Sequence, residues 1–499
     1  MEIDLETKKI QVFREAFHQI KRIQTGTESV VPDVNEDIGK IVTVQSAILL
    51  KNKDIVADGV NVGGEVQVSI LYITEMENSV SQLKLSKSFE LNYETIDIES
   101  DANAQINLQI SNIEARVINP RKVSVTLEIC GELSCYITDE IDDDSFIPEE
   151  KHPELKTNKE SISVMLPNAV CEKAFAINEQ YTFPTSKAGP SQLVFQKVSL
   201  DCTDNQQVGS KLIVKGNVNV SVCYFSKENP YPIFTQFNSP FSQIVDTGTD
   251  ESDNCSIKIE LTSNYFELIE TISGEYALDM ELHALIQIVS RKKRSISYIS
   301  DAYCNLMPVE NKIQKLAFSD ASQLRRETIT FEEKLNVADE CEDVICVIPS
   351  MTQASIMNTT FGSNIHFDIL YKSTSGNIAS VRRAANANHE DLPAGSRLID
   401  CKMNNIDFRP NETIIDAVCS IVFLYQTFST IDCSRVCSVE IMEDKRYDVA
   451  AFPSVSIVRV ENESLWDLAK HYHSSVEKIC LFNNTDNIQD SMLMIPKEC

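Results

Sequence analysis

The sequence predicts a mainly β protein, with three tandem β-sandwich or barrel-like domains followed by a small βααβ module. Three observations lead to this prediction: a threefold internal repeat, alternating apolar residues within each copy, and two helix-start signals close to the C-terminus. At 499 residues and 42% hydrophobic content, the chain can form several cores, since domains usually have roughly 100–200 residues.

The repeat is centred on a strand pattern that ends on tyrosine. Its copies are GGEVQVSILY at 63–72, KGNVNVSVCY at 215–224 and GSNIHFDILY at 362–371. Every second residue is apolar, which is typical of a strand with one buried face. The copies are about 150 residues apart, which fits tandem domains rather than a solenoid. A second alternating strand follows in each copy, at 123–129, 276–282 and 415–421, and together these strands indicate a sandwich or barrel.

Domain boundaries are predicted where the alternation stops and charge collects, as in the acidic run DEIDDD at 139–144. The predicted organisation is an N-terminal extension at 1–27, a first repeat at 28–138, an acidic linker at 139–176, a second repeat at 177–305, a linker at 306–327, a third repeat at 328–442, a linker at 443–453 and a module at 454–499.

The N-terminal extension is predicted to contain a helix. Ile10, Phe13, Phe17 and Ile20 have the spacing of one apolar helical face. This face would pack on the first β-domain or bind a partner, and periodicity leaves both interpretations open.

The acidic composition excludes several partners. Lys and Arg number 45 against 74 Asp and Glu, so the net charge of −29 repels nucleic acid and anionic lipid. The basic run RKKR at 291–294 is an exception, and it is interpreted as a solvated strand end or turn, or alternatively as a docking patch. We find no stretch of ~18 apolar residues and no N-terminal export signal, and therefore expect no direct membrane insertion and a cytoplasmic location.

The sequence predicts neither catalysis nor a bound cofactor or metal. It has no phosphate-binding, zinc-protease or nucleophile-elbow motif. The fifteen cysteines are scattered through apolar runs and are interpreted as reduced core residues, and Cys433 and Cys437 have no histidine close in sequence. His471 and His473 are two residues apart and would point to different faces of a helix.

The last 46 residues contain two helix-start signals. Ser464 and Asp467 form a capping box, with the serine as N-cap, and SSVE at 474–477 forms a second one. Apolar strands at 455–460 and 492–495 would complete a βααβ unit.

Two family resemblances give these elements a function. The stretch ESVVPDVNEDIGKI at 28–41, together with the strand at 63–72, resembles the SPOCS domain of spore-coat-associated proteins, and VVPD at 30–33 is its specific part. The second and third repeats lack that element and are assigned by internal similarity. The C-terminal module resembles a LysM module.

The LysM resemblance implies a binding groove formed by two loops. The partner-binding candidates are Asn462, Glu463, Ser464, Trp466, Asn483, Asn484 and Asp490. Trp466, the single tryptophan, is interpreted as partly core or as a partner contact. NESLW at 462–466 and QDS at 489–491 replace the usual Gly-Asp-Thr-Leu-Trp and Pro-Gly-Gln, and these departures count against glycan binding.

The complete layout resembles clostridial coat proteins that bind the coat-basement ATPase of stage IV sporulation. That resemblance implies a mother-cell scaffold at the outer forespore surface, which contacts the ATPase through its LysM module, contacts other coat proteins, and helps the coat to encase the forespore. A peptidoglycan-binding protein is the alternative, and an enzyme with a site between the repeats is a third hypothesis.

Overall fold

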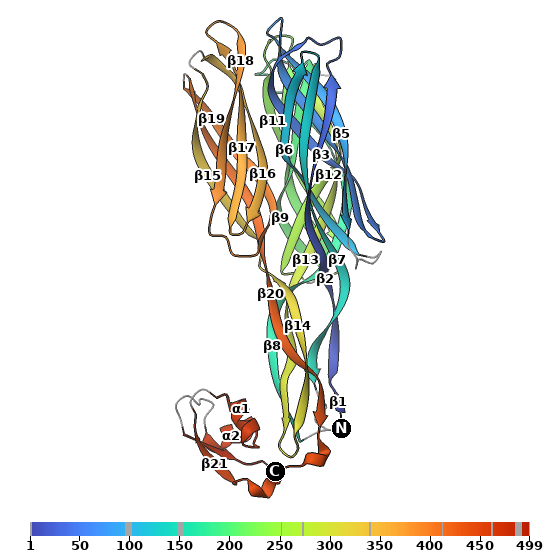
Figure 1. Cartoon of the computed structure of the whole chain (residues 1–499). Coiled ribbons are helices and arrows are strands. Elements are labelled where there is room, and N and C mark those ends of the chain that lie inside the picture. Colours follow the sequence, from blue (N-terminus) through green and yellow to red (C-terminus); the bar gives the residue numbers. More distant parts are fainter. Residues whose placement is uncertain are drawn as a thin grey trace.

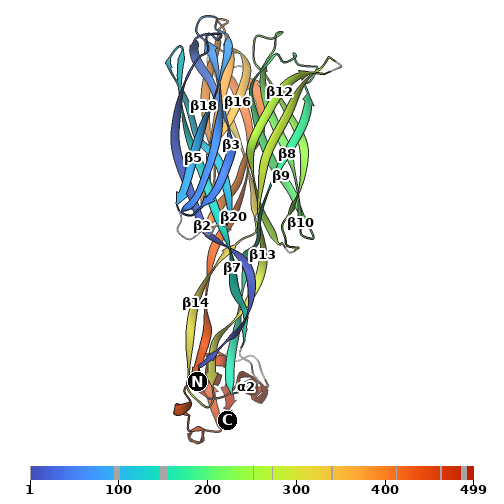
Figure 2. The same ribbon diagram turned by 90° about the vertical axis from the view of Figure 1, so that its right-hand side faces the viewer.

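The computed structural model confirms the mainly β fold. It describes residues 2–94, 102–146, 154–250, 252–271, 274–338, 341–411, 413–460, 463–484 and 492–498. Three β-sandwiches lie side by side and form the head of the molecule, long strands continue from them into a narrow stalk, and the C-terminal module lies at the far end of the stalk (Figures 1 and 2).

Each sandwich consists of two antiparallel three-stranded sheets, and the strand order is the same in all three. The first has β3 (Ile38–Val56), β4 (Gly59–Thr74) and β5 (Val80–Glu94) against β2 (Glu6–Val30), β7 (Lys122–Phe146) and β6 (Asn103–Asn119). The second has β9 (Gln192–Val208), β10 (Lys211–Phe225) and β11 (Ile233–Asp246) against β8 (Leu155–Thr182), β13 (Tyr276–Cys304) and β12 (Asn254–Glu270).

The third sandwich differs in its first strand, which is divided in two. Its sheets are β16 (Cys341–Met357), β17 (Thr360–Ser373) and β18 (Ile378–His389) against β15 (Arg325–Asn336), β20 (Ile414–Ile441) and β19 (Ser396–Asn411). β14 (Val309–Ala321) precedes β15 and pairs with the stalk part of β20, as does the short β1 (Glu2–Asp4).

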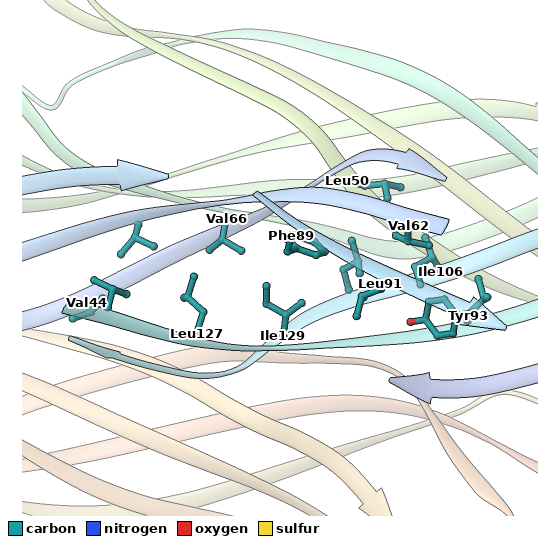
Figure 3. Close-up of a cluster of buried hydrophobic side chains, with 14 of the residues drawn as sticks. Val44, Leu50, Val62, Val66, Phe89, Leu91, Tyr93, Ile106, Leu127 and Ile129 are labelled. Atoms are coloured by element: carbon teal, nitrogen blue, oxygen red, sulfur yellow. The ribbon is translucent and has the colours of Figure 1, made fainter. Parts of the chain in front are cut away.

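The repeated tyrosines lie in the sandwich cores. Tyr72 and Tyr224 are fully buried, and Tyr371 is nearly so. The Tyr72 hydroxyl donates to the carbonyl of Glu36 at 3.1 Å, and that of Tyr224 donates to the carbonyl of Ala188 at 3.2 Å. Both of these phenols therefore have a hydrogen-bond partner in the loop that precedes their sheet. Figure 3 shows the aliphatic and aromatic side chains of the first core, drawn from both sheets.

The three sandwiches also share an apolar contact with one another. Leu71, Cys223 and Leu370, the residues directly before the repeated tyrosines, belong to one buried cluster. Neighbouring strand residues point to opposite faces, so β4, β10 and β17 bury one face inside their own sandwich and the other between the sandwiches.

Polar side chains add to the contact between the first and second sandwiches. Lys258 lies 3.3 Å and His18 lies 3.0 Å from the carboxylate of Glu132. Burial opposes ionisation of Glu132, but these two partners hold its pKa at about 2. Burial raises the pKa of the neighbouring Glu260 to about 8, and the Leu108 amide donates to it at 3.2 Å.

The stalk consists of three two-stranded ribbons, β2 with β7, β8 with β13, and β14 with β20. Each ribbon contributes to a common apolar core, which includes Val12, Leu166, Ile296, Phe318 and Cys433. An isolated two-stranded ribbon is only marginally stable in water. The ribbons are therefore stabilised by packing on one another, and the stalk connects all three repeats.

The predicted N-terminal helix and two of the predicted linkers are wrong. Residues 10–20 lie within β2, where Val12 rather than the helical stripe is buried and a register shift occurs between Glu15 and Phe17. The segment 139–146 lies in β7, residues 155–176 lie in β8 and residues 309–321 lie in β14, while 147–153 fall outside the described residues. The predicted linker at 443–453 contains η1 (Glu443–Lys445) and η2 (Val449–Ala451).

The acidic run that suggested a linker forms ion pairs across strands. Asp139 lies 2.9 Å from Arg14 in the paired strand β2, and Asp142 lies 2.6 Å from Arg435 in β20. Asp139 therefore links the two strands of one ribbon, whereas Asp142 joins that ribbon to the ribbon formed by β14 and β20.

Replacing Ile296 by alanine should destabilise the whole assembly of repeats. Ile296 is 2% exposed in the common stalk core, and such a truncation costs about 2–5 kcal/mol. Ile313→Ala, on the same stalk but 60% exposed, should change stability by less than about 0.5 kcal/mol. Guanidinium unfolding followed by far-ultraviolet circular dichroism measures both, and equal stabilities would contradict a shared core.

Candidate partner-binding site on the C-terminal module

The C-terminal module has the predicted βααβ order. It contains β21 (Val455–Arg459), α1 (Leu465–His471), α2 (Val476–Asn483) and β22 (Met492–Pro496). β21 and β22 pair antiparallel, and Val460, Leu468, Ala469, Ile479, Leu493 and Ile495 form its core.

The predicted N-cap of α1 is confirmed, and α2 starts where the second box predicts a helix, but the predicted side-chain cap of α2 is absent. The Asp467 amide donates to the Ser464 hydroxyl at 3.1 Å, so Ser464 caps α1. α2 begins after Ser475, whose side chain makes no capping hydrogen bond. Ser474 is fully buried, and its hydroxyl donates to the carbonyl of Pro496, which joins the inter-helix turn to β22.

A stalk residue completes the core of the module. Tyr303, near the end of β13, is 4% exposed and belongs to the same apolar cluster as Leu468 and Ile479. Its hydroxyl donates to the carbonyl of Ser474 at 2.8 Å, and burial raises the pKa of this hydroxyl. The module is therefore packed on the stalk tip, because part of its core is supplied from outside it.

Asp301 fixes the helix α1 to the stalk. The indole Nε1 of Trp466 donates to Oδ2 of Asp301 at 2.8 Å, and Nζ of Lys470 lies 2.7 Å from the same oxygen. The Trp466 ring also packs edge-on against Tyr303, with a centroid separation of 4.8 Å. Trp466 thus lies at the contact between the module and the stalk, with its indole N–H already satisfied.

The other predicted groove residues have different environments. Glu463 is exposed beside the α1 cap. The Asn483 side chain donates to the carbonyls of Ile479 and Met494 at 2.8 and 2.7 Å and accepts from the Met494 amide, so it joins α2 to β22. Asn484 is exposed in the left-handed conformation. Asn462 and Asp490 lie outside the described residues.

The outer face of the module's sheet is apolar and exposed. Ile457 and Met494 are directly opposite each other and are 65% and 43% exposed. Val455 and Met492, on the same face, are 42% and 66% exposed. Sequence reasoning did not identify this surface. The sequence signal for it is that both strands carry apolar residues at adjacent positions. Adjacent residues point to opposite faces, and a sheet packed on one core buries only one of them, so the other apolar residues are exposed.

His473 lies on the side of the module that faces the connecting segment. Its backbone has a φ of 52°, and its ring is 4.7 Å from that of Tyr447 and 4.4 Å from that of Phe452. Burial, and then the neighbouring His471, lower the pKa of His473. The folded module therefore stabilises the neutral form of the His473 imidazole.

None of the helices in the described part of the chain is long and apolar enough to cross a membrane. Within the described ranges, His, Cys, Asp and Glu side chains do not gather in groups of three or more that could hold a metal ion.

Comparison with known proteins identifies one segment of the head. Residues 37–118 match the family model described as SipL, SPOCS domain, and this range covers β3 to β5 and most of β6. The match supports a SipL-like, sporulation-related protein. It begins just after the VVPD element at 30–33. Neither the curated proteins nor the solved structures contain a match to this chain.

Replacing Asp301 by alanine should release the module from the stalk. The substitution leaves the Trp466 indole and the Lys470 ammonium without their acceptor, and hydrogen bonds to charged groups contribute about 1.5–3 kcal/mol each. We expect the fluorescence of the single tryptophan to shift to the red and proteolysis within 443–453 to accelerate. Glu463→Ala, which removes an exposed carboxylate beside the same helix, should change neither, and an unaltered D301A spectrum would contradict the docking.

Acidification should weaken the packing around His473. Its pKa is lowered on folding, so the stability that it contributes is present above the unfolded-state value near 6.5 and is lost as the pH falls through the folded value. Thermal unfolding monitored by Trp466 fluorescence should therefore occur at lower temperature at pH 5.5 than at pH 7.5. His473→Asn keeps a residue that tolerates positive φ and should reduce this pH dependence. Identical pH profiles for H473N and the parent chain would contradict this assignment.

Proposed function

We propose that this protein is a non-enzymatic scaffold of spore coat and envelope morphogenesis. Its C-terminal module binds the coat-basement ATPase of stage IV sporulation and thereby helps the coat to encase the forespore. It acts in the mother-cell cytoplasm, at the outer forespore surface, where the head contacts other coat proteins. The SPOCS-domain match at 37–118 supports the connection with sporulation.

The observation that carries the proposal is the exposed apolar face of β21 and β22. Val455, Ile457, Met492 and Met494 place several large apolar side chains on one small sheet. Clustered apolar side chains on a water-exposed surface mark sites of protein–protein contact, and methionine is enriched at such sites. We assign this face, rather than the predicted groove, as the main contact with the ATPase.

The fixed position of the module favours binding. Because Tyr303 and Asp301 hold α1 against the stalk, the opposite elements of the module are presented in one orientation. A pre-oriented surface loses less freedom on association than a tethered domain. If the ATPase is polymerised on the forespore, weak contacts from the head add avidity to that of the module.

The chemistry of the module supports a protein partner over a glycan. Sugars are commonly bound through aromatic stacking and polar groups, but the Trp466 indole N–H is bound to Asp301 and its ring packs on Tyr303. The apolar sheet face offers few hydrogen-bonding side chains to a sugar. A protein surface with its own apolar patch is a better complement.

Ile457→Asp should weaken binding of the full-length chain to the stage IV coat ATPase by about tenfold or more, because it places a charge at the centre of the apolar face. Biolayer interferometry with immobilised ATPase measures the affinity. Ile313→Asp is the matched control, since Ile313 is similarly exposed, at 60%, but lies on the stalk.

The control should bind as the parent chain does, and circular dichroism should show that both variants remain folded. Unchanged affinity of I457D would contradict the assignment of this face. Binding of the parent chain to soluble peptidoglycan fragments but not to the ATPase would favour the wall-binding alternative.

A further inference from the structure

A cavity of about 370 Å³ lies at the neck, which is the region where β7, β13 and β20 pass from the head into the stalk. Its lining comes from β2, β7, β8, β13, β14 and β20, so all three repeats contribute. About half of the lining residues are apolar, with Phe13, Leu166, Leu316, Phe318 and Phe428 among them. The cavity is separate from the C-terminal module, and nothing in the proposed function depends on it.

Arg291, the first residue of the basic run at 291–294, lines this cavity. Arg291 is only 3% exposed. It therefore lies neither in a solvated turn nor in a surface docking patch, the two interpretations considered for the basic run. The register of β13 with β8 shifts between Ser290 and Arg291, opposite Ala169 and Pro167. Such a bulge changes the direction of the neighbouring side chains. It therefore explains why the charged side chain of Arg291 points into the cavity.

The guanidinium of Arg291 is incompletely satisfied. Its Nη2 donates to the hydroxyl of Tyr136 at 3.4 Å, and its Cζ lies 5.5 Å from the centre of the Phe428 ring. Its Nη1 is buried without a hydrogen-bond partner among the described residues. A buried cation that lacks an anionic partner is strongly unfavourable, so this group calls for a negative charge inside the cavity.

The carboxylates in the described part of the cavity lining are already paired with other cations. The pairs are Glu15 with Arg397 at 2.9 Å, Asp139 with Arg14 at 2.9 Å, Glu140 with Lys9 at 3.3 Å, and Asp142 with Arg435 at 2.6 Å. Arg397 also lies 4.2 Å from the centre of the Phe428 ring, on the side chain that Arg291 contacts. The charge of Arg291 is therefore left for a ligand to neutralise.

We propose that the neck cavity binds a small organic acid, with its carboxylate on Arg291 and Tyr136 and its apolar body against the aromatic and aliphatic wall. One guanidinium and one phenol match a single carboxylate, because an arginine can donate two parallel hydrogen bonds to it. Burial raises the pKa of Tyr136 to about 12, so its hydroxyl is protonated and able to donate at neutral pH. The apolar remainder of the wall disfavours a fully hydrated inorganic anion.

Part of the cavity lining reaches the molecular surface. Arg14 and Glu140 belong to its lining, and their side chains are 57% and 52% exposed. The ion pairs of these residues lie at this exposed part of the lining, whereas Arg291 and Tyr136 are buried. The cavity therefore combines ion pairs at its exposed part with apolar side chains and one buried guanidinium, and a few placed polar groups among apolar ones are common in small-molecule sites.

Isothermal titration calorimetry of the full-length chain with octanoate tests the proposal, with octanamide as the neutral probe of similar shape. We expect octanoate to bind with one site per chain and at least about tenfold more tightly than octanamide, since only the carboxylate neutralises Arg291. Arg291→Met should lower the octanoate affinity by about tenfold or more. Lys293→Met, which removes one charge from an exposed position in the same basic run, should leave the affinity within about twofold.

Three results of the octanoate and octanamide titrations would overturn the proposal. They are the absence of octanoate binding, equal affinities for octanoate and octanamide, and equal losses in R291M and K293M. The comparison of the two probes uses the parent chain alone, so it decides the question even if R291M does not fold. Inorganic phosphate that binds at the cavity in place of octanoate would likewise contradict an organic acid as the ligand.

Discussion

The common core of the stalk is the constraint on which the rest of the structure depends. Three ribbons leave the head, and each buries apolar side chains, such as Val12, Ile296 and Phe318, that no single ribbon could cover. Most of these strands continue directly into the sandwiches, and in the third repeat β14 is followed directly by the sandwich strand β15. The stalk therefore fixes the sandwiches relative to one another. It also places Asp301 and Tyr303 at the end of β13, where they hold the C-terminal module.

Two different parts of the module's surface contact the stalk and remain exposed. α1 contacts the stalk through Trp466 and Lys470, whereas β21 and β22 expose the face that includes Ile457 and Met494. Attachment to the stalk and the proposed partner binding therefore do not compete for the same side chains. The neck cavity around Arg291 lies elsewhere, at the junction of the three repeats, so a ligand there would act on the junction and not on the module.

Local signals in the sequence were sufficient for the repeated tyrosine strands and for the βααβ order, because both are set by periodicity and capping at short range. They failed where distant segments meet. The apolar stripe at 10–20 has helical spacing because a bulge near Phe17 breaks the alternation of a strand. Asp139 and Asp142 suggested a linker because their partners, Arg14 and Arg435, are far away in sequence. Trp466 stands out as the single tryptophan, but nothing near it in sequence indicates that its acceptor is Asp301.

Hydrogen–deuterium exchange of the full-length chain, with and without the stage IV coat ATPase, tests the central claim most directly. The account predicts that the partner slows exchange in β21 and β22, while α1, already packed on the stalk, exchanges at the same rate in both states. Protection confined to α1, or to the head with no change in the two strands, would contradict the assignment of the exposed sheet face as the partner-binding surface.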